Sequence, residues 1–231
     1  MSPPPGTLAQ TPPRRAARGR GDDMLFLTLG ASAGVSSPAL LDQAAHAAGQ
    51  AYFGTPGTIT AALREAADEV NQRLLAANQR EAAEAHADGR LFAAVLRGSD
   101  LYLAQCGPGQ AVLIRSGNLT RFLSEEAAAR PLGLSVAPHV RFHHAQVAPG
   151  DLLLMTTEAA PAWSDPTLSG LARRNEDRVC RLGERRVFGS VDESRQVEVV
   201  VVGPAGRFAR QARDGREPGD DGTRDVEDDV V

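Results

Sequence analysis

The side chains best suited to catalysis or metal binding are few and scattered in this 231-residue sequence. His143 and His144 are adjacent, in a segment (139–147) where side chains alternate as they do in a β-strand. Neighbouring strand residues point to opposite faces, so these two imidazoles are not expected to bind one metal ion. Cys106 and Cys180 lack metal-ligand spacing and are too few for a disulfide framework, so we interpret them as small buried side chains.

The absence of other known motifs and the overall charge exclude several classes of function. The sequence has no G-x-G-x-x-G, P-loop or zinc-finger spacing, and Gly107-Pro108-Gly109 by itself predicts a turn. The formal net charge of −4 argues against a general nucleic-acid-binding protein, which would need a basic face. No apolar run is long enough to span a bilayer, and the N-terminus has no apolar signal core. We therefore expect a cytoplasmic protein with neither a nucleic-acid nor a membrane partner.

Short apolar strands dominate the middle of the chain. Residues 91–97, 101–106 and 111–115 are apolar runs separated by turn sequences, and we expect them to form one antiparallel meander that extends to Arg121. Their low charge implies burial on both faces, so helices must cover the outer face. Further strands are predicted at 24–29, 139–147, 151–156 and 197–202.

Three helices are predicted around these strands. The first begins at Ser37, with Pro38 in its first turn, and the second begins at Thr58 or Thr60 and runs past Asn78. A third helix is expected after residues 164–166. Strands that follow one another, with helices grouped at either side, indicate an α+β domain with antiparallel sheets.

The two ends of the chain differ in composition from the middle. Residues 1–17 are rich in proline and arginine without hydrophobic periodicity, which predicts a disordered leader. Residues 204–231 are polar and end in an acidic run, which predicts a disordered tail. One folded domain is therefore expected over 18–203.

Four segments, in order, resemble the PPM-type (type-2C) metal-dependent serine/threonine protein phosphatases of bacteria. They are MLFLTLGASAG, RGSDLYLAQCGPGQAVLIRSGNL, RPLGLSVAPHVRFHHAQVAPGDLLLMTTEAA and SRQVEVVVV. The family has a strand running into Asp-Gly-x-Gly-Gly, a Gly-Asp-Ser-Arg turn between strands, a Leu-Leu-Leu strand ending in Asp-Gly, and a terminal Asp-Asn strand. The resemblance implies a four-layer α-β-β-α sandwich, in which helices flank two antiparallel sheets.

The resemblance also implies a two-metal site, and this chain departs from it. Family members use Mn²⁺ or Mg²⁺, held by carboxylates, to activate the water that attacks a phosphomonoester. The residues that match the family's site are Gly30 and Ala31 for the bridging Asp-Gly, Pro108 for the turn aspartate after Gly107, Glu158 and Ala159 for the later Asp-Gly, and Arg195 for the terminal aspartate. Near the start, Arg18 with Asp22 and Asp23 matches the family's Arg-x-x-x-Glu-Asp, whose arginine holds the substrate phosphate.

Three of four core carboxylates are thus replaced, which implies a catalytically degenerate phosphatase. No cofactor is expected; if activity is retained, it would need Mn²⁺ or Mg²⁺. Residual metal candidates are Asp23, Glu158 and Asp192, and a shifted alignment would add Asp42, Asp88 or Asp165. Without a metal, we expect Arg195 to pair with Glu158 as a guanidinium-carboxylate fork.

Three functional hypotheses follow. The first is a noncatalytic regulatory or protein-interaction module in bacterial phospho-signalling, with a serine/threonine kinase or a phosphoprotein as partner. The second is a weak or altered metal-dependent phosphatase, and the third is an unrelated α+β domain.

Overall fold

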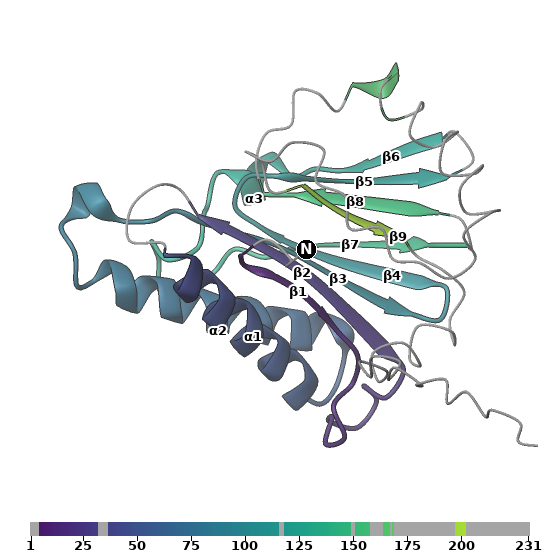
Figure 1. The fold of residues 1–231 in the computed structure, drawn as a ribbon, viewed down its shortest axis with the longest axis horizontal. Helices are drawn as coiled ribbons and strands as arrows, with labels where there is room; N and C mark the ends of the chain where they lie inside the picture. Colours follow the sequence, from purple (N-terminus) through teal and green to yellow (C-terminus); the bar gives the residue numbers. More distant parts are fainter. Residues whose placement is uncertain are drawn as a thin grey trace, which may run out of the picture.

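Two antiparallel sheets form the centre of the molecule in this computed structural model (Figure 1). The structure describes residues 5–31, 37–115, 118–148, 151–157, 164–166, 168 and 197–201. The first sheet has the strand order β1 (Thr7–Gln10), β2 (Asp23–Ala31), β3 (Gly89–Arg97), β4 (Asp100–Cys106), β7 (Arg141–Gln146). The second has the order β6 (Asn118–Phe122), β5 (Gln110–Arg115), β8 (Leu152–Thr156), β9 (Val197–Val201). The expected α+β class with antiparallel sheets is confirmed.

Helices α1 (Pro38–Gly54) and α2 (Ile59–Asn78) begin at the predicted caps. The Ser37 hydroxyl accepts a hydrogen bond from Leu40 N, and the Thr58 hydroxyl accepts one from Ala61 N. Each cap satisfies an amide that the first helical turn leaves without a partner. Two short helices, η1 (Ala83–Ala85) and α3 (Glu125–Ala128), lie in the connections.

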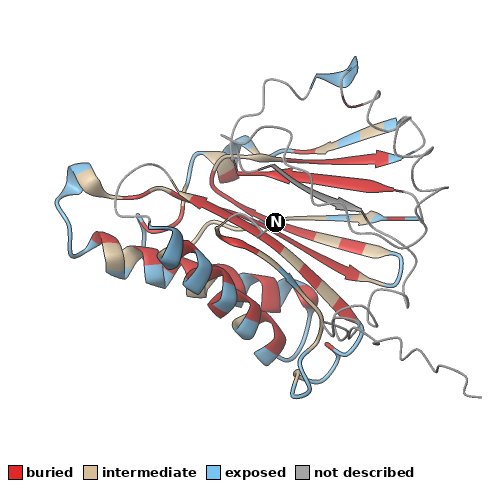
Figure 2. Ribbon diagram, in the orientation of Figure 1, coloured by how far each residue is buried: buried red, intermediate tan, exposed pale blue. Residues whose placement is uncertain are grey.

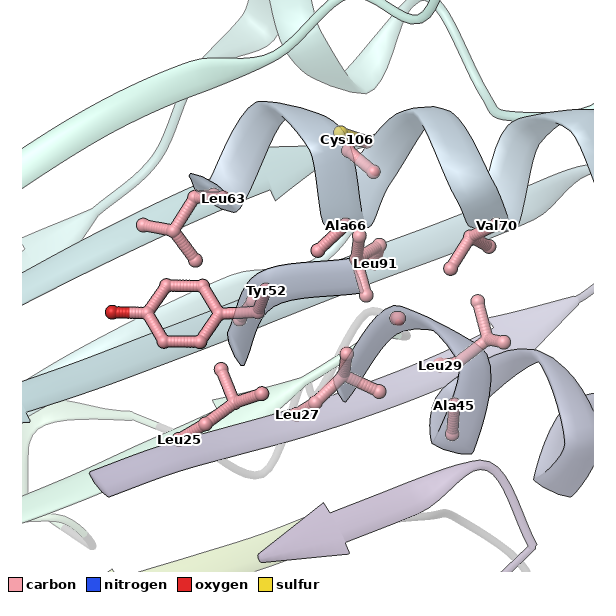
Figure 3. Close-up of a cluster of buried hydrophobic side chains, with 14 of the residues drawn as sticks. Leu25, Leu27, Leu29, Ala45, Tyr52, Leu63, Ala66, Val70, Leu91 and Cys106 are labelled. Atoms are coloured by element: carbon pink, nitrogen blue, oxygen red, sulfur yellow. The ribbon is translucent and has the colours of Figure 1, made fainter. Parts of the chain in front are cut away.

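Both long helices cover the outer face of the first sheet (Figure 1). Alternate residues of β2 and β3 point toward them and join one buried apolar cluster, shown in Figure 3, with leucines of the strands against small residues of the helices. Ala45 and Ala66 let the helices approach the leucine side chains closely. This layer explains why β2 and β3 are apolar on both faces.

The other face of β3 packs against the second sheet. Phe92, Ala94 and Leu96 meet Leu113 and Met155 in a second buried cluster between the sheets. Figure 2 shows the buried strands of both layers in red. Side chains between the sheets therefore come from even-numbered positions of β2 and β3.

The expected single meander is wrong in one respect. After β4 the chain leaves the first sheet and enters the second, so β3 and β4 belong to one sheet while β5 and β6 belong to the other. The change occurs at Gly107-Pro108-Gly109, where Gly107 has φ +75° and Gly109 has φ +141°. Both values favour glycine. The turn directs the chain across the space between the two sheets, here called the interlayer, instead of back along β4.

The predicted leader is also wrong over residues 7–10. These form β1, which pairs antiparallel with β2 from Thr7↔Thr28 to Gln10↔Leu25. Further along, Ala17 N donates to Phe53 O. Backbone pairing with a buried strand orders this segment although its own sequence has little apolar pattern.

Two predicted segments fall outside the described residues. The acidic tail at 204–231 lies there, and so does most of the third helix, of which residues 164–166 and Leu168 are described. A second outer helical layer therefore stays a prediction. In the described part of the chain, no helix is long and apolar enough to cross a membrane.

Candidate functional site

Three strands bring Gly30, Arg90 and Thr157 together at one end of the space between the sheets. Gly30 of β2 faces Arg90 of β3 in the antiparallel register. Thr157 follows β8 directly and continues the inward alternation of Leu153 and Met155. A guanidinium nitrogen of Arg90, Nη1, lies 3.4 Å from the Thr157 carbonyl oxygen.

Thr157 occupies the space that a side chain at position 30 would use. A Cβ built on Gly30 would overlap the Thr157 hydroxyl oxygen and lie 3.1 Å from its Cβ. A larger residue at position 30 would therefore force Thr157 to rotate. By the resemblance described above, this position is expected to match the family's bridging aspartate.

Four buried polar atoms at this end have no hydrogen-bond partner among the described residues. They are Thr28 Oγ1, Arg90 Nε, Gln105 Oε1 and Thr157 Oγ1. Thr28 precedes Gly30 by two residues on the same strand face, and Gln105 faces Phe92 across the β3-β4 ladder. Buried polar groups are normally paired, so such a group marks a place for water, an ion or a ligand.

The crossing turn Gly107-Pro108-Gly109, which joins the two sheets, packs against Arg90 and its neighbours. A Cβ built on Gly107 would lie 3.3 Å from Arg90 Cα, and one built on Gly109 would lie 2.8 Å from Phe92 Cε2. Pro108, matched to the family's turn aspartate, is half-buried between them and offers no oxygen side chain. The side chains described here are hydroxyl, amide and guanidinium groups, which do not suit a hard divalent ion that needs carboxylate oxygens.

Asp23 lies at the opposite end of β2. It is seven residues from Gly30 along an extended strand, a separation of about 23 Å. The structure therefore does not bring Asp23 together with Gly30, and a role for Arg18, Asp22 and Asp23 as the family's Arg-x-x-x-Glu-Asp stays a prediction. Arg18 and Asp22 are both exposed.

Asp23 instead anchors a buried ionic cluster. Its carboxylate is fully buried and accepts hydrogen bonds from Tyr52 Oη at 2.6 Å and from Arg97 Nε and Nη2 at 2.6 and 2.9 Å. Arg20 Nη1 lies 3.6 Å from the same carboxylate. Burial and the hydrogen bond to Asp23 raise the pKa of Tyr52, and the hydrogen bond from Arg97 to Asp23 raises the pKa of Arg97.

Arg20 ties this cluster to the helix layer. Its guanidinium donates to the carbonyl oxygens of Thr55, Gly57 and Thr58, which join α1 to α2. The side chain is fully buried. The cluster thus has a structural role, and sequence reasoning missed it because its members are far apart in the chain.

Several candidate positions cannot be placed. Glu158, Ala159, Asp192 and Arg195 lie outside the described residues, so the expected pairing of Arg195 with Glu158 stays a prediction.

The other aspartates considered have separate surroundings. Asp42 accepts a hydrogen bond from Gly6 N at 2.8 Å, on the helix-covered side of the first sheet. Asp165 is 73% exposed and pairs with Arg121, and Asp88 is half-buried just before β3. In the described ranges, no group of three histidine, cysteine or acidic residues could hold a metal ion.

The histidine and cysteine predictions have clear outcomes. His143 packs on Phe122 between the sheets, while His144 packs on Tyr102 and contacts Asp100 at 2.8 Å, so the two imidazoles face opposite ways as predicted. Burial and nearby Arg141 lower the pKa of His143. Cys106 is buried as expected, and its burial raises the pKa of the thiol to about 12.

Comparison with known proteins supports the architecture. No protein-family model and no curated protein matches the sequence. Among solved structures, a substituted form of a bacterial serine phosphatase aligns with a TM-score of 0.57 at 13% identity, over 84% of this chain and 96% of that chain. The Streptococcus agalactiae serine/threonine phosphatase aligns with a TM-score of 0.53 at 12% identity, over 75% of this chain and 90% of that one. The chain has the PPM-type phosphatase fold.

A third neighbour has a regulatory description. PppA, named as a key regulatory component of the type VI secretion system of Pseudomonas aeruginosa, aligns with a TM-score of 0.50 at 15% identity, over 72% of this chain and 82% of that chain. The PPM-type fold is therefore shared at very low sequence identity. An identity this low does not show what the residues at the end of the interlayer do in this chain.

Proposed function

We propose that this chain is a catalytically degenerate PPM-type domain that acts as a noncatalytic regulatory or protein-interaction module in serine/threonine phospho-signalling. The observation that carries the proposal is the group formed by Gly30, Arg90 and Thr157. Position 30, matched to the bridging aspartate, has no side chain and is closed by Thr157. Arg90, which faces position 30 on the neighbouring strand, is a cation and repels a metal ion.

The electrostatics support a loss of metal chemistry. A two-metal mechanism holds both ions about 3.5 to 4 Å apart, and each needs anionic oxygen ligands. At this end of the interlayer, the described side chains supply a positive charge and neutral groups instead. A cytoplasmic protein whose partner is a serine/threonine kinase or a phosphoprotein is the setting that we propose for the module.

Phosphatase assays test this proposal directly. The full chain is incubated with millimolar Mn²⁺ or Mg²⁺ and a chromogenic phosphomonoester, beside the same reaction with a chelator. We expect no metal-dependent release of phosphate. An active bacterial serine/threonine phosphatase assayed in parallel verifies the reagents, and metal-dependent turnover by this chain would contradict the proposal.

The second candidate is a weak or altered Mn²⁺- or Mg²⁺-dependent phosphatase. It is favoured by the fold, which solved serine and serine/threonine phosphatases share, and by the carboxylates that remain in the sequence at Glu158 and Asp192. On that hypothesis, Glu158→Gln and Asp192→Asn would each abolish any turnover found, while Asp22→Asn, at an exposed position, would leave it unchanged.

A further inference from the structure

Arg90 differs from the other arginines that contact buried groups. Arg20 and Arg97 both lie beside the Asp23 carboxylate, whereas Arg90 has no ion pair among the described residues. Among the described residues, its one hydrogen bond, to the Thr157 carbonyl, is long at 3.4 Å, and its buried Nε has no partner. Burying part of a cation without an anion is costly, so this guanidinium is suited to bind an anionic ligand.

The groups around Arg90 are mainly hydrogen-bond donors. Thr28 and Thr157 are buried, and neither hydroxyl oxygen has a partner. A hydroxyl rotates to donate to an anion, and a guanidinium presents a planar fork of N–H groups that fits two oxygens of a phosphate. The unpaired Gln105 amide oxygen is an acceptor, which suits the proton of a hydrogen phosphate or a bound water.

Gly30 contributes to this arrangement because it has no side chain. It faces Arg90 across the ladder, so an aspartate there would place a carboxylate beside the guanidinium and neutralise it. With glycine, the positive charge of Arg90 stays available. The same substitution that removes a metal ligand thus leaves an anion-binding side chain.

We propose that Arg90, Thr157 and Thr28 form a metal-free site for a phosphate group at this end of the interlayer. The site rests on the proposed noncatalytic function, because a two-metal centre would need the same place for its cations. Phosphate carries up to two negative charges and offers several oxygens, so it matches one guanidinium and two hydroxyls better than a single carboxylate does.

Binding is measured on the full chain in a chelator, so that no metal contributes. Isothermal titration calorimetry and ¹H–¹⁵N spectra are recorded with inorganic phosphate, with a phosphoserine peptide, and with the same peptide unphosphorylated. We expect saturable binding of both phosphate ligands, a shift of the Arg90 Nε–H signal, and none of this with the unphosphorylated peptide. Equal affinities identify the phosphate group alone as the ligand, and tighter peptide binding adds contacts with the peptide.

Variants assign the binding to Arg90. Arg90→Ala should weaken phosphate binding about tenfold or more, since a charged hydrogen-bonded fork is lost. Arg90→Lys should bind with intermediate affinity, because it keeps the charge but not the fork. Gly30→Asp should abolish binding. Arg14→Ala is the matched control: it removes the same charge from an exposed position in the β1–β2 connection, at the end of β2 opposite Gly30, and should bind like the parent.

The results separate this site from the proposed function. No saturable binding in chelator, or equal weakening by Arg90→Ala and Arg14→Ala, overturns the site and leaves the noncatalytic function standing. Metal-dependent turnover together with Arg90-dependent binding in chelator overturns the function alone. If Arg90→Ala does not fold, the Arg90 Nε–H signal of the parent chain and the Arg90→Lys variant still decide the outcome.

Discussion

Asp23 illustrates how far a single residue's environment can differ from what its sequence position suggests. The pattern Arg18 to Asp23 matches a family motif, yet the carboxylate binds Tyr52 and Arg97, which are 29 and 74 positions away in the chain. Local spacing carries no information about such partners. The buried cluster could be recognised only once β2, β3 and α1 were placed together.

The first prediction concerns the stability that Asp23 provides. Asp23→Ala leaves the fully buried Arg20 without its carboxylate, and removing one member of a buried ion pair costs about 3 to 5 kcal/mol. We expect a loss of that size in the free energy of unfolding, measured by urea denaturation. The exposed neighbour gives the control, since Asp22→Ala should change it by less than about 0.5 kcal/mol. Equal midpoints for the two variants would show that the cluster contributes nothing to stability.

At the scale of elements, helix starts and strand positions could be predicted, but sheet membership could not. Ser37 and Thr58 are caps because their short polar side chains bond to nearby amides, which is a local property. The assignment of β5 to the second sheet depends on the crossing turn and on β8, which lies about forty residues further on. β1 was missed because its partner, not its own sequence, orders it.

The second prediction tests the crossing turn. Gly109 has φ +141°, and a Cβ there would lie 2.5 Å from Thr156 O and 2.8 Å from Phe92 Cε2. Gly98 also has a positive φ, +58°, but a Cβ there would meet nothing within 4 Å. Gly98→Ala should therefore cost only the backbone strain, about 1 to 2 kcal/mol, whereas Gly109→Ala should cost more because backbone and ring atoms must move.

Thermal and urea unfolding of the two glycine variants separate strain from steric overlap. A Gly109→Ala protein as stable as Gly98→Ala would mean that the two sheets adjust around the turn without cost. In that case the turn would not determine how β4 is joined to β5.

At the scale of the whole molecule, the two groups of buried polar side chains lie at opposite ends of β2. The end with Gly30, Arg90 and Thr157 has buried polar atoms without a partner among the described residues, whereas both oxygens of the Asp23 carboxylate at the other end accept hydrogen bonds from Tyr52 or Arg97. The sequence could indicate that Gly30, at the first end, offers no carboxylate. It could not indicate Arg90, because its position beside Gly30 follows from the register of two strands about sixty residues apart.

The last prediction is that Mn²⁺ leaves the stability of the whole molecule nearly unchanged. A ligand that binds only the folded state at about 1 mM adds about 4 kcal/mol when its site is micromolar, but only about 0.4 kcal/mol when its site is millimolar. For a chain of this size, these values correspond to rises of roughly 8 to 16 °C and roughly 1 to 2 °C in the melting temperature. Since the described side chains at the Arg90 end include no carboxylate ligand and one cation, we expect the smaller rise. Melting curves in chelator and in Mn²⁺ decide between them, and the double variant Glu158→Gln, Asp192→Asn serves as the control. A large rise in the parent that this variant loses would mean that those two carboxylates hold the metal despite Arg90, and the domain would then have to be treated as a metal-dependent phosphatase.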